Sequence, residues 1–237
     1  MRRVALSSRA TDARELMDDP ACDARALERT YHHFDVVNRV VAGWRSVYRE
    51  LLRPALSRER GNTLLDIGSG GGDVPRLLAR WAARDGFALD ITAIDPDPRA
   101  QAYAAVQRPV PGLGFRAARS DQLVAEGRRY DIVTSNHVLH HLAPAELAAL
   151  LADSERLAGR LAVHSDIERS PLAYAAFSVG TWPFFRDSFI RADGLTSIRR
   201  SFTRAELRAV APAGWTVQNR LPFRNLLVHR AAGVPRA

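Results

Sequence analysis

The feature of the sequence that most constrains the fold is a short apolar run that ends in a cluster of glycines. Residues 64–73 read LLDIGSGGGD, and apolar side chains then recur at helical spacing from Val74 to Trp81. A run of this length predicts a buried strand, and the glycines let the backbone turn and come close to a ligand. The N-terminus of the following helix presents free N–H groups at the same turn. The unit therefore predicts a site for a nucleoside cofactor.

Strand-length apolar runs alternate with helical patterns from about residue 61 onward. Such alternation predicts helices on both faces of a parallel sheet. We therefore expect an α/β fold with a Rossmann-like doubly wound sheet, mostly parallel with an antiparallel last strand. The expected strands are 63–67, 89–94, 115–118, 132–135, 161–164, 215–218 and 225–229, and proline opens an expected helix at 144–157.

The sequence predicts an N-terminal helical cap (1–60) and a sheet domain (61–237). In residues 26–56, apolar side chains recur every three or four positions, which predicts two helices that close over the ligand edge of the sheet. A helical layer that only completes the core is an equally good interpretation of most of these residues. An insertion at about 167–201 is aromatic without a clean period, and it predicts a mobile lid that forms an apolar pocket.

Composition excludes several classes of protein. The sequence has no lysine, which excludes a P-loop and a Schiff-base mechanism. Its formal charge of +8 comes from arginines spread along the whole chain, so we expect no nucleic acid partner. Cys22 is the only cysteine, so we expect no intramolecular disulfide and no cysteine-built metal site. No membrane-length apolar run and no apolar signal region are present, so we expect a cytoplasmic protein without a membrane span.

Two acidic residues distinguish the glycine turn from a dinucleotide site. In the fingerprint G-x-G-x-x-G counted from Gly68, the third glycine would stand at position 73, which is Asp73. Asp66, at the end of the expected strand, would repel a pyrophosphate but would tolerate a cofactor that carries positive charge. These residues, and the lack of a recognisable hydride-transfer pair, disfavour an NAD-dependent dehydrogenase.

From about Leu64 to Leu157 the sequence resembles the class I S-adenosylmethionine (SAM)-dependent methyltransferases. In that family the LLDIGSGGGD segment runs past the methionine part of the cofactor, and Asp66 supports the turn and the cofactor's amino group. Asp95, in AIDPDP, matches the acidic residue that binds both ribose hydroxyls. The resemblance thus implies SAM as the cofactor, with contacts at Arg39, Asp66, Gly68, Ser69, Gly70, Asp95, Pro96, Ser120, Asp121 and Asn136.

Some of these contacts rest on short matches. Ser120 and Asp121 follow the third expected strand, where an aspartate of the family holds the adenine amino group; a simple turn aspartate is the alternative. Arg39 lies in a segment that resembles the pattern before the first strand, which implies that it binds the carboxylate of the cofactor. Ala42 departs from the Gly-Gly pair that related sequences often have there.

Residues 130–142, YDIVTSNHVLHHL, resemble the fourth motif of the small-molecule branch, in its quinone-biosynthesis and polyketide-tailoring types. Nucleic-acid amino methyltransferases carry an N/D-P-P-Y/F segment at this point, and this chain has SNHV instead. Because the carboxyl end of this strand borders the cleft, we expect Asn136 and His137 nearest the transferred methyl group. The resemblance implies a small-molecule acceptor, which we interpret as aromatic.

The reaction itself predicts a base. Methyl transfer from a sulfonium depends mainly on alignment, but a phenolic acceptor with a pKa near 10 must lose its proton. A neutral histidine suits that task at neutral pH. We predict His137 as the catalytic base, with His140 second and His164 third; for His140 and His141, capping and packing of a short helix is the alternative. These histidines show no clear facial geometry with an acidic partner, so no metal is predicted.

Three functions remain open. The preferred one is methylation of a hydroxyl of a small phenolic or polyketide-like metabolite. Carbon methylation of an aromatic or quinone ring needs the same phenolate and looks the same in sequence. A noncatalytic cofactor-binding module is disfavoured, because such a module would be free to lose Asp66, Asp95 and Asp121. A homodimer is compatible with the sequence, which carries no signal for the oligomeric state.

Overall fold

One mixed sheet organises the molecule. The computed structural model describes residues 6–40, 43–182, 185 and 187–231, and at 35–37, 39 and 40 only the backbone. Within these residues, seven strands form a sheet in the order β3-β2-β1-β4-β5-β7-β6. Strands β1 to β5 are parallel, and β7 is antiparallel to β5 and β6, so the predicted α/β fold is confirmed. The strands are β1 (Asn62–Ile67), β2 (Leu89–Asp95), β3 (Leu113–Ala117), β4 (Tyr130–Asn136), β5 (Ala158–Ile167), β6 (Trp215–Arg220) and β7 (Arg224–Arg230).

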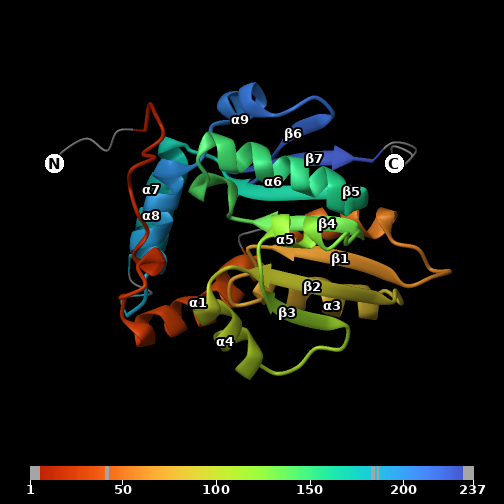
Figure 1. Ribbon diagram of the computed structural model, residues 1–237. Coiled ribbons are helices and arrows are strands. Elements are labelled where there is room, and N and C mark those ends of the chain that lie inside the picture. The colour runs from red at the N-terminus through yellow and green to blue at the C-terminus, as the bar shows by residue number, and fades with distance from the viewer. Residues whose placement is uncertain (1–5, 41–42, 183–184, 186, 232–237) are drawn as a thin grey trace.

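Helices cover both faces of the sheet (Figure 1). Successive strand side chains point to opposite faces, so each strand contributes to two cores. Leu64 packs in the core beneath the helices that flank β1, and its neighbour Leu65 packs in the core on the other face. The sheet-flanking helices are α2 (Trp44–Val47) with the π-helical turn η2 (Tyr48–Leu52), η3 (Arg53–Ala55), α3 (Asp73–Arg84), α4 (Pro98–Val106), α5 (Ser120–Ala125), η4 (Leu139–His141), α6 (Pro144–Leu157) and α9 (Arg204–Val210).

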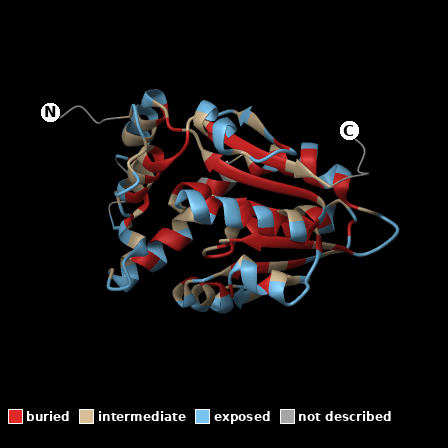
Figure 2. Cartoon of the chain, turned by 45° about the horizontal axis from the view of Figure 1, so that its top comes forward, coloured by how far each residue is buried: buried red, intermediate tan, exposed pale blue. Residues whose placement is uncertain are grey.

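The predicted N-terminal cap has two different parts. Trp44 and Tyr48 are 1% exposed and pack with Leu64 in the main core, so residues 44–56 are a layer that completes this core. Figure 2 shows the same buried band running through the strands and the helices against them. Only the first part, which contains η1 (Leu16–Asp18) and α1 (Ala24–Val40), lies at the carboxyl edge of the sheet.

The insertion after β5 folds into two helices, α7 (Pro171–Thr181) and α8 (Ile190–Arg200). They pack together closely: a Cβ at Gly194 would lie 2.3 Å from the ring of Phe177. The helical period was hidden in the sequence because Leu172 and Val179 are apolar but exposed. Figure 1 shows this pair standing across the carboxyl ends of the parallel strands, beside the N-terminal segment. None of the described helices is both long enough and apolar enough to cross a membrane.

Candidate active site

The carboxyl ends of the parallel strands open into a cavity of about 930 Å³. Residues at the ends of β1, β2, β4 and β5 line one side of it, and residues of α1, α7, α8 and the N-terminal segment line the other. Ligands of open α/β sheets bind at this edge, and the volume lies near the top of the range of roughly 300–1,000 Å³ typical of ligand pockets.

The turn between β1 and α3 requires its glycines. Gly68 and Gly70 have φ angles of 69° and 51°, in the left-handed region that side chains with a Cβ disfavour. A Cβ at Gly68 would also lie 2.5 Å from Cγ2 of Val138, which leaves no room for one. The backbone of this turn therefore lies directly against the cavity, which Gly68, Ser69 and Gly70 line.

Two predicted carboxylates lie at neighbouring strand ends and line the cavity. Asp66 is 2% exposed and accepts a hydrogen bond of 2.7 Å from Oγ1 of Thr134. Burial raises the pKa of Asp66 to about 7, the Thr134 hydrogen bond opposes the shift, and the charges of nearby Asp73 and Asp95 add to it. Asp95 accepts backbone hydrogen bonds from Gly70 (2.8 Å) and Asp97 (2.9 Å), and burial raises its pKa as well.

Helix α1 contacts the residues beside the glycine turn through Asn38, the neighbour of Arg39 in the sequence. Nδ2 of Asn38 donates to Oδ2 of Asp73 at 2.7 Å, and its Oδ1 accepts from Nδ2 of Asn136 at 3.4 Å. Asn38 is 5% exposed and lines the cavity. It thus joins the helical cap to the first residue of α3 and to the end of β4.

His137 follows β4 and lines the cavity. Its φ of 58° is unusual for a residue with a Cβ, and its backbone N–H donates to the carbonyl of Ser165 at 2.9 Å. Nδ1 of the ring lies 3.8 Å from Oδ1 of Asp166, the buried carboxylate near the end of β5. A ring oriented toward a carboxylate through one nitrogen has the other nitrogen available for a ligand.

His140 is held between two carboxylates. Its Nδ1 lies 2.7 Å from Oδ1 of Asp166, and its Nε2 lies 3.2 Å from Oε1 of Glu15. Burial alone would lower the pKa of His140, but the charges and hydrogen bonds of Asp166 and Glu15 outweigh burial and raise it to about 9. Against the effect of burial, the charge of His140 and the contacts of Asp166 with His137 and His140 lower the pKa of Asp166.

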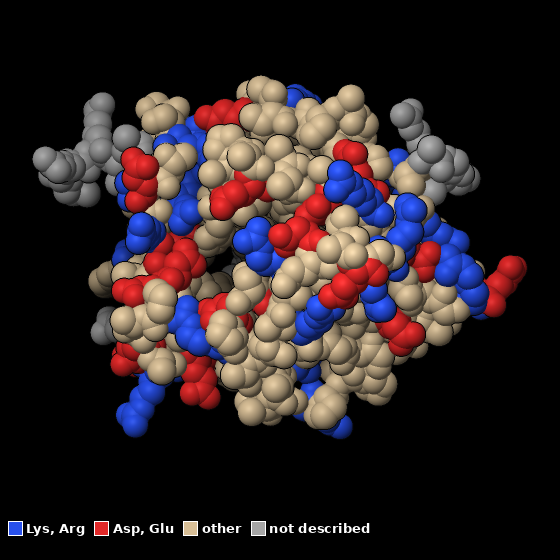
Figure 3. All heavy atoms as spheres, in the orientation of Figure 1, with Lys and Arg blue, Asp and Glu red and all other residues tan. Residues whose placement is uncertain are grey.

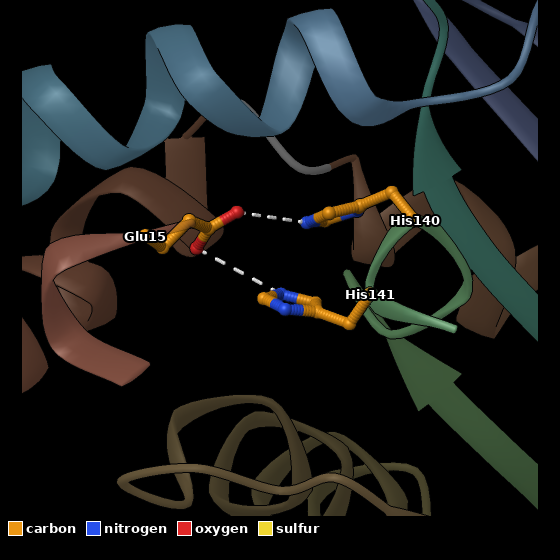
Figure 4. A group of neighbouring side chains, drawn as sticks. All are labelled: Glu15, His140 and His141. Atoms are coloured by element: carbon orange, nitrogen blue, oxygen red, sulfur yellow. Dashed lines mark hydrogen bonds and ion pairs between the residues drawn. The ribbon is translucent and has the colours of Figure 1, made fainter. Parts of the chain in front are cut away.

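Glu15 is the main residue that the sequence analysis missed. Burial disfavours its charged form, but hydrogen bonding to His140 and the charges of His141 and His140 lower its pKa to about 2. Figure 4 shows the side chain of Glu15 pointing between the two imidazoles, with His141 Nε2 at 3.7 Å from Oε2. Ser197 of α8 also donates to it at 2.7 Å. The contacts join residues more than a hundred positions apart, so no sequence pattern indicates them.

Glu15, His140 and His141 offer nitrogen and oxygen atoms that all lie within 4.8 Å of one another. Two imidazoles and a carboxylate are ligand types of zinc sites. In this structure the same atoms are engaged with each other, since His140 Nε2 hydrogen-bonds to Glu15.

Three predicted residues, Ser120, Asp121 and His164, are not among the residues that line the cavity. Ser120 begins α5 and donates to Oδ2 of Asp153 at 2.7 Å, and Asp121 is exposed beside Arg119, so neither lines the cavity. His164 is fully buried in β5, bonded to Ser135 and stacked on Trp215; burial lowers its pKa to about 3. Arg39 falls in the last turn of α1, and its side chain lies outside the described residues. The remaining predicted residues, Asp66, Gly68, Ser69, Gly70, Asp95, Pro96, Asn136, His137 and His140, all line the cavity.

Comparison with known proteins gives matches to methyltransferases. The methyltransferase domain family matches residues 41–211. The ubiquinone biosynthesis O-methyltransferase of Cereibacter sphaeroides is 36% identical over 124 residues, which are 51% of this chain and 47% of that protein. The enzyme of the same name from Caulobacter vibrioides is 38% identical over 124 residues, 51% of this chain and 46% of that protein. The chain thus spans about half the length of the curated relatives it matches.

Solved structures agree with the fold. Human N-acetylserotonin methyltransferase, crystallised in complex with SAM, superimposes with a TM-score of 0.60 at 14% identity. The superposition covers 88% of this chain and 56% of that one.

Proposed function

We propose a function from one premise: the chain belongs to the methyltransferase domain family, whose match extends over residues 41–211. The proposed reaction is transfer of a methyl group from SAM to a hydroxyl of a small aromatic molecule, phenolic or quinone-related. The observation that carries the proposal is a single cavity lined by Asp66 and Asp95 at one place and by His137 at another. A candidate cofactor subsite and a candidate base therefore share one cavity.

The residues around the glycine turn fit a cationic nucleoside. Asp66, Asp73 and Asp95 all line the cavity, and the charges of Asp73 and Asp95 help to raise the pKa of Asp66. Carboxylates that repel each other favour a ligand with positive charge, and SAM carries an ammonium and a sulfonium. We assign the ammonium to the neighbourhood of Asp66.

The carboxylate of Asp95 has hydrogen-bond acceptor positions left for the ribose hydroxyls. A carboxylate offers about four acceptor positions, and two of those on Asp95 are taken by the backbone N–H groups of Gly70 and Asp97. The remaining positions suit two neighbouring hydroxyl donors, and hydrogen bonds to a charged acceptor are strong. We therefore assign the ribose hydroxyls to Asp95.

His137 is the proposed base. When bound, SAM supplies an electrophilic methyl group on a cationic sulfur. With Nδ1 of His137 toward Asp166 at 3.8 Å, Nε2 is left to take the proton from the acceptor hydroxyl. The ionised Asp166 stabilises the imidazolium that forms, because opposite charges this close attract strongly in a buried site.

We propose a positioning role for His140, which the sequence predicted as the second candidate for the catalytic base. Because Asp166 and Glu15 raise its pKa to about 9, His140 is an imidazolium at neutral pH with both nitrogens donating. An imidazolium has no lone pair to accept a proton. We assign it the positioning of Asp166, which also accepts from the backbone N–H of His140 at 2.8 Å.

Apolar side chains also line the cavity and suit an aromatic acceptor. Phe177 of α7, Ile198 of α8 and Phe223 before β7 are among them. Aromatic rings stack favourably on such side chains. The two relatives named above are O-methyltransferases of ubiquinone biosynthesis, which supports a phenolic, quinone-related acceptor.

The test is a label-transfer assay with methyl-labelled SAM over a panel of catechols, hydroquinones and hydroxybenzoates. We expect transfer to oxygen by the wild-type chain, and a loss of roughly 10²–10⁴-fold in turnover for His137→Ala at saturating SAM. The affinity for S-adenosylhomocysteine should stay unchanged in this variant. His32→Ala, on the exposed side of α1, is the control. A ring-methylated product would show that the acceptor atom is carbon rather than oxygen. Full activity of His137→Ala would show that His137 is not the base.

A further inference from the structure

A buried arginine in the cavity wall is used by none of the steps above. Arg224 is the first residue of β7, paired with Ile167 of β5. It is 3% exposed, and it lines the cavity together with Pro222 and Phe223 of the preceding turn. The guanidinium is therefore within reach of a bound ligand while it is largely removed from bulk water.

The protein provides hydrogen-bond acceptors for only part of the Arg224 guanidinium. Its Nη1 donates to Oγ of Ser165 at 3.3 Å. Its Nε and Nη2 have no hydrogen-bond partner among the described residues, and the described carboxylates form no ion pair with it. Burial, with the charge of Arg220 as a smaller contribution, lowers the pKa of Arg224 to about 10, so the group stays charged at neutral pH.

A buried charge in this position is unfavourable unless a ligand of opposite charge pairs with it. Buried charges in proteins are paired, because removal from water without a partner is costly in free energy. The local backbone nevertheless makes room for this group: a Cβ at Gly43 would lie 2.5 Å from Nη2 of Arg224. Gly43 has a φ of 53°, so backbone conformation and space both favour glycine there.

We propose that Arg224 binds the carboxylate of a small molecule held in the cavity. A guanidinium presents paired N–H donors in a planar fork that matches the two oxygens of a carboxylate, and Nε and Nη2 are the buried pair without a hydrogen-bond partner among the described residues. The inference rests on the proposed function and deepens it. The carboxylate belongs either to the methionine part of SAM or to an anionic aromatic acceptor.

Calorimetry with two nucleosides distinguishes the two possible sources of the carboxylate. S-adenosylhomocysteine carries the amino-acid carboxylate, and 5′-methylthioadenosine shares the adenosine and sulfur but lacks it. If the cofactor supplies the carboxylate, Arg224→Gln weakens S-adenosylhomocysteine binding by roughly 10- to 100-fold and leaves 5′-methylthioadenosine within about twofold. Arg224→Lys, which keeps the charge but loses the fork, should fall between wild type and Arg224→Gln.

If the acceptor supplies the carboxylate, Arg224→Gln leaves both nucleosides unchanged. The chain saturated with S-adenosylhomocysteine then binds hydroxybenzoates better than the matching hydroxybenzamides, and Arg224→Gln abolishes that preference. The control is Arg220→Gln, since Arg220 pairs with Arg224 across β6 and β7 but bonds to Glu50 and does not line the cavity. It should leave all four affinities unchanged.

The inference is overturned if Arg224→Gln weakens the two nucleosides equally, or if it changes neither a nucleoside affinity nor a preference for carboxylates. Thermal unfolding of the unliganded variants shows whether a substitution impairs folding. Removal of an unpaired buried charge should leave the Tm of Arg224→Gln equal to or above that of wild type. Failure of the wild-type chain to bind either nucleoside would instead count against the proposed function itself.

Discussion

At the scale of single residues, Asp66 and Arg224 are ionisable groups of the cavity whose buried surroundings oppose their usual charge. Asp66 lies among other carboxylates, and Arg224 lacks an anionic partner among the described residues. Each such group is unfavourable in the unliganded protein and favourable with the right ligand. Functional sites often carry this local loss of stability, which the rest of the fold offsets.

Asp66 should show this trade-off directly. Its pKa of about 7 in the folded state exceeds the ordinary value of 3.8, so the native state binds more protons between about pH 4 and 7, and stability falls as pH rises through that window. We expect Asp66→Asn to raise the free energy of unfolding at pH 8 by roughly 1–4 kcal/mol and to abolish SAM binding. Urea denaturation at pH 5 and 8 measures the first effect, and the gain should be smaller at pH 5. A destabilised variant at pH 8 would contradict the argument.

His140 should have the opposite pH dependence. Its folded-state pKa is raised from 6.5 to about 9, so its contribution to stability is fully present below about pH 6.5 and is lost as pH rises through 9. His140→Gln leaves Asp166 and Glu15 without their cation, and we expect a loss of roughly 3–5 kcal/mol at pH 6. The difference in Tm between wild type and variant should shrink toward pH 9.5. His33→Gln, a half-buried histidine of α1, is the control, and a constant difference across this pH range would refute the assignment.

At the scale of elements, the N-terminal strap (residues 9–19) joins α8 to the turn after β4. Oxygens of Asp193 in α8 accept the backbone N–H groups of Leu16 (2.7 Å) and Met17 (3.0 Å). Glu15 reaches both Ser197 of α8 and His140 of η4. The strap therefore closes one side of the cavity through polar contacts with a neighbouring helix.

Release of the strap should impair acceptor binding more than cofactor binding. Asp193→Ala removes both acceptors for the strap backbone, so we expect faster limited proteolysis within residues 9–19 and a higher KM for the acceptor. The affinity for S-adenosylhomocysteine should change by less than about threefold, since the glycine turn is untouched. Asp187→Ala, at an exposed position before α8, serves as the control. Unchanged proteolysis in Asp193→Ala would show that other contacts hold the strap.

At the scale of the whole molecule, positive charge is interspersed with carboxylates on the face that Figure 3 shows. Figure 3 shows acidic and basic side chains intermixed across the visible face. Many arginines bond to carboxylates of the chain itself, for example Arg169 to Glu206 and Arg99 to Asp97. The formal charge of +8 is thus spread out rather than focused, and nearby opposite charges weaken its field.

The distribution predicts weak, nonspecific contact with nucleic acid. In fluorescence anisotropy at 0.15 M salt we expect no saturable binding of a labelled duplex or single strand at micromolar protein. Free polyarginine of similar charge is the positive control. Saturable binding under these conditions would contradict this prediction. The sequence leaves a homodimer open, and sedimentation equilibrium of the same sample tests for one.

The sequence by itself determined the parts of this protein that depend on short-range order. The period of apolar residues predicted the strands, and the glycine run after β1 predicted the turn, because both are set within a few residues. Asp66 and Asp95 could be placed together in advance, since they end adjacent parallel strands. His137 could be placed at the cleft for the same reason, as it follows the end of β4.

Only the tertiary structure decided which polar groups meet across the chain. The pairing of Glu15 with His140 spans 125 positions, and that of Arg224 with Ser165 spans 59, so no periodicity encodes them. Asp121 matched a motif in sequence, but the orientation of α5 leaves it exposed and away from the cavity. The charge state of His140 was equally hidden, because the two carboxylates that raise its pKa against the effect of burial meet it only once the strap and β5 are in place. Ionisation and ligand contacts are properties of surroundings in space, and the fold brings those surroundings together.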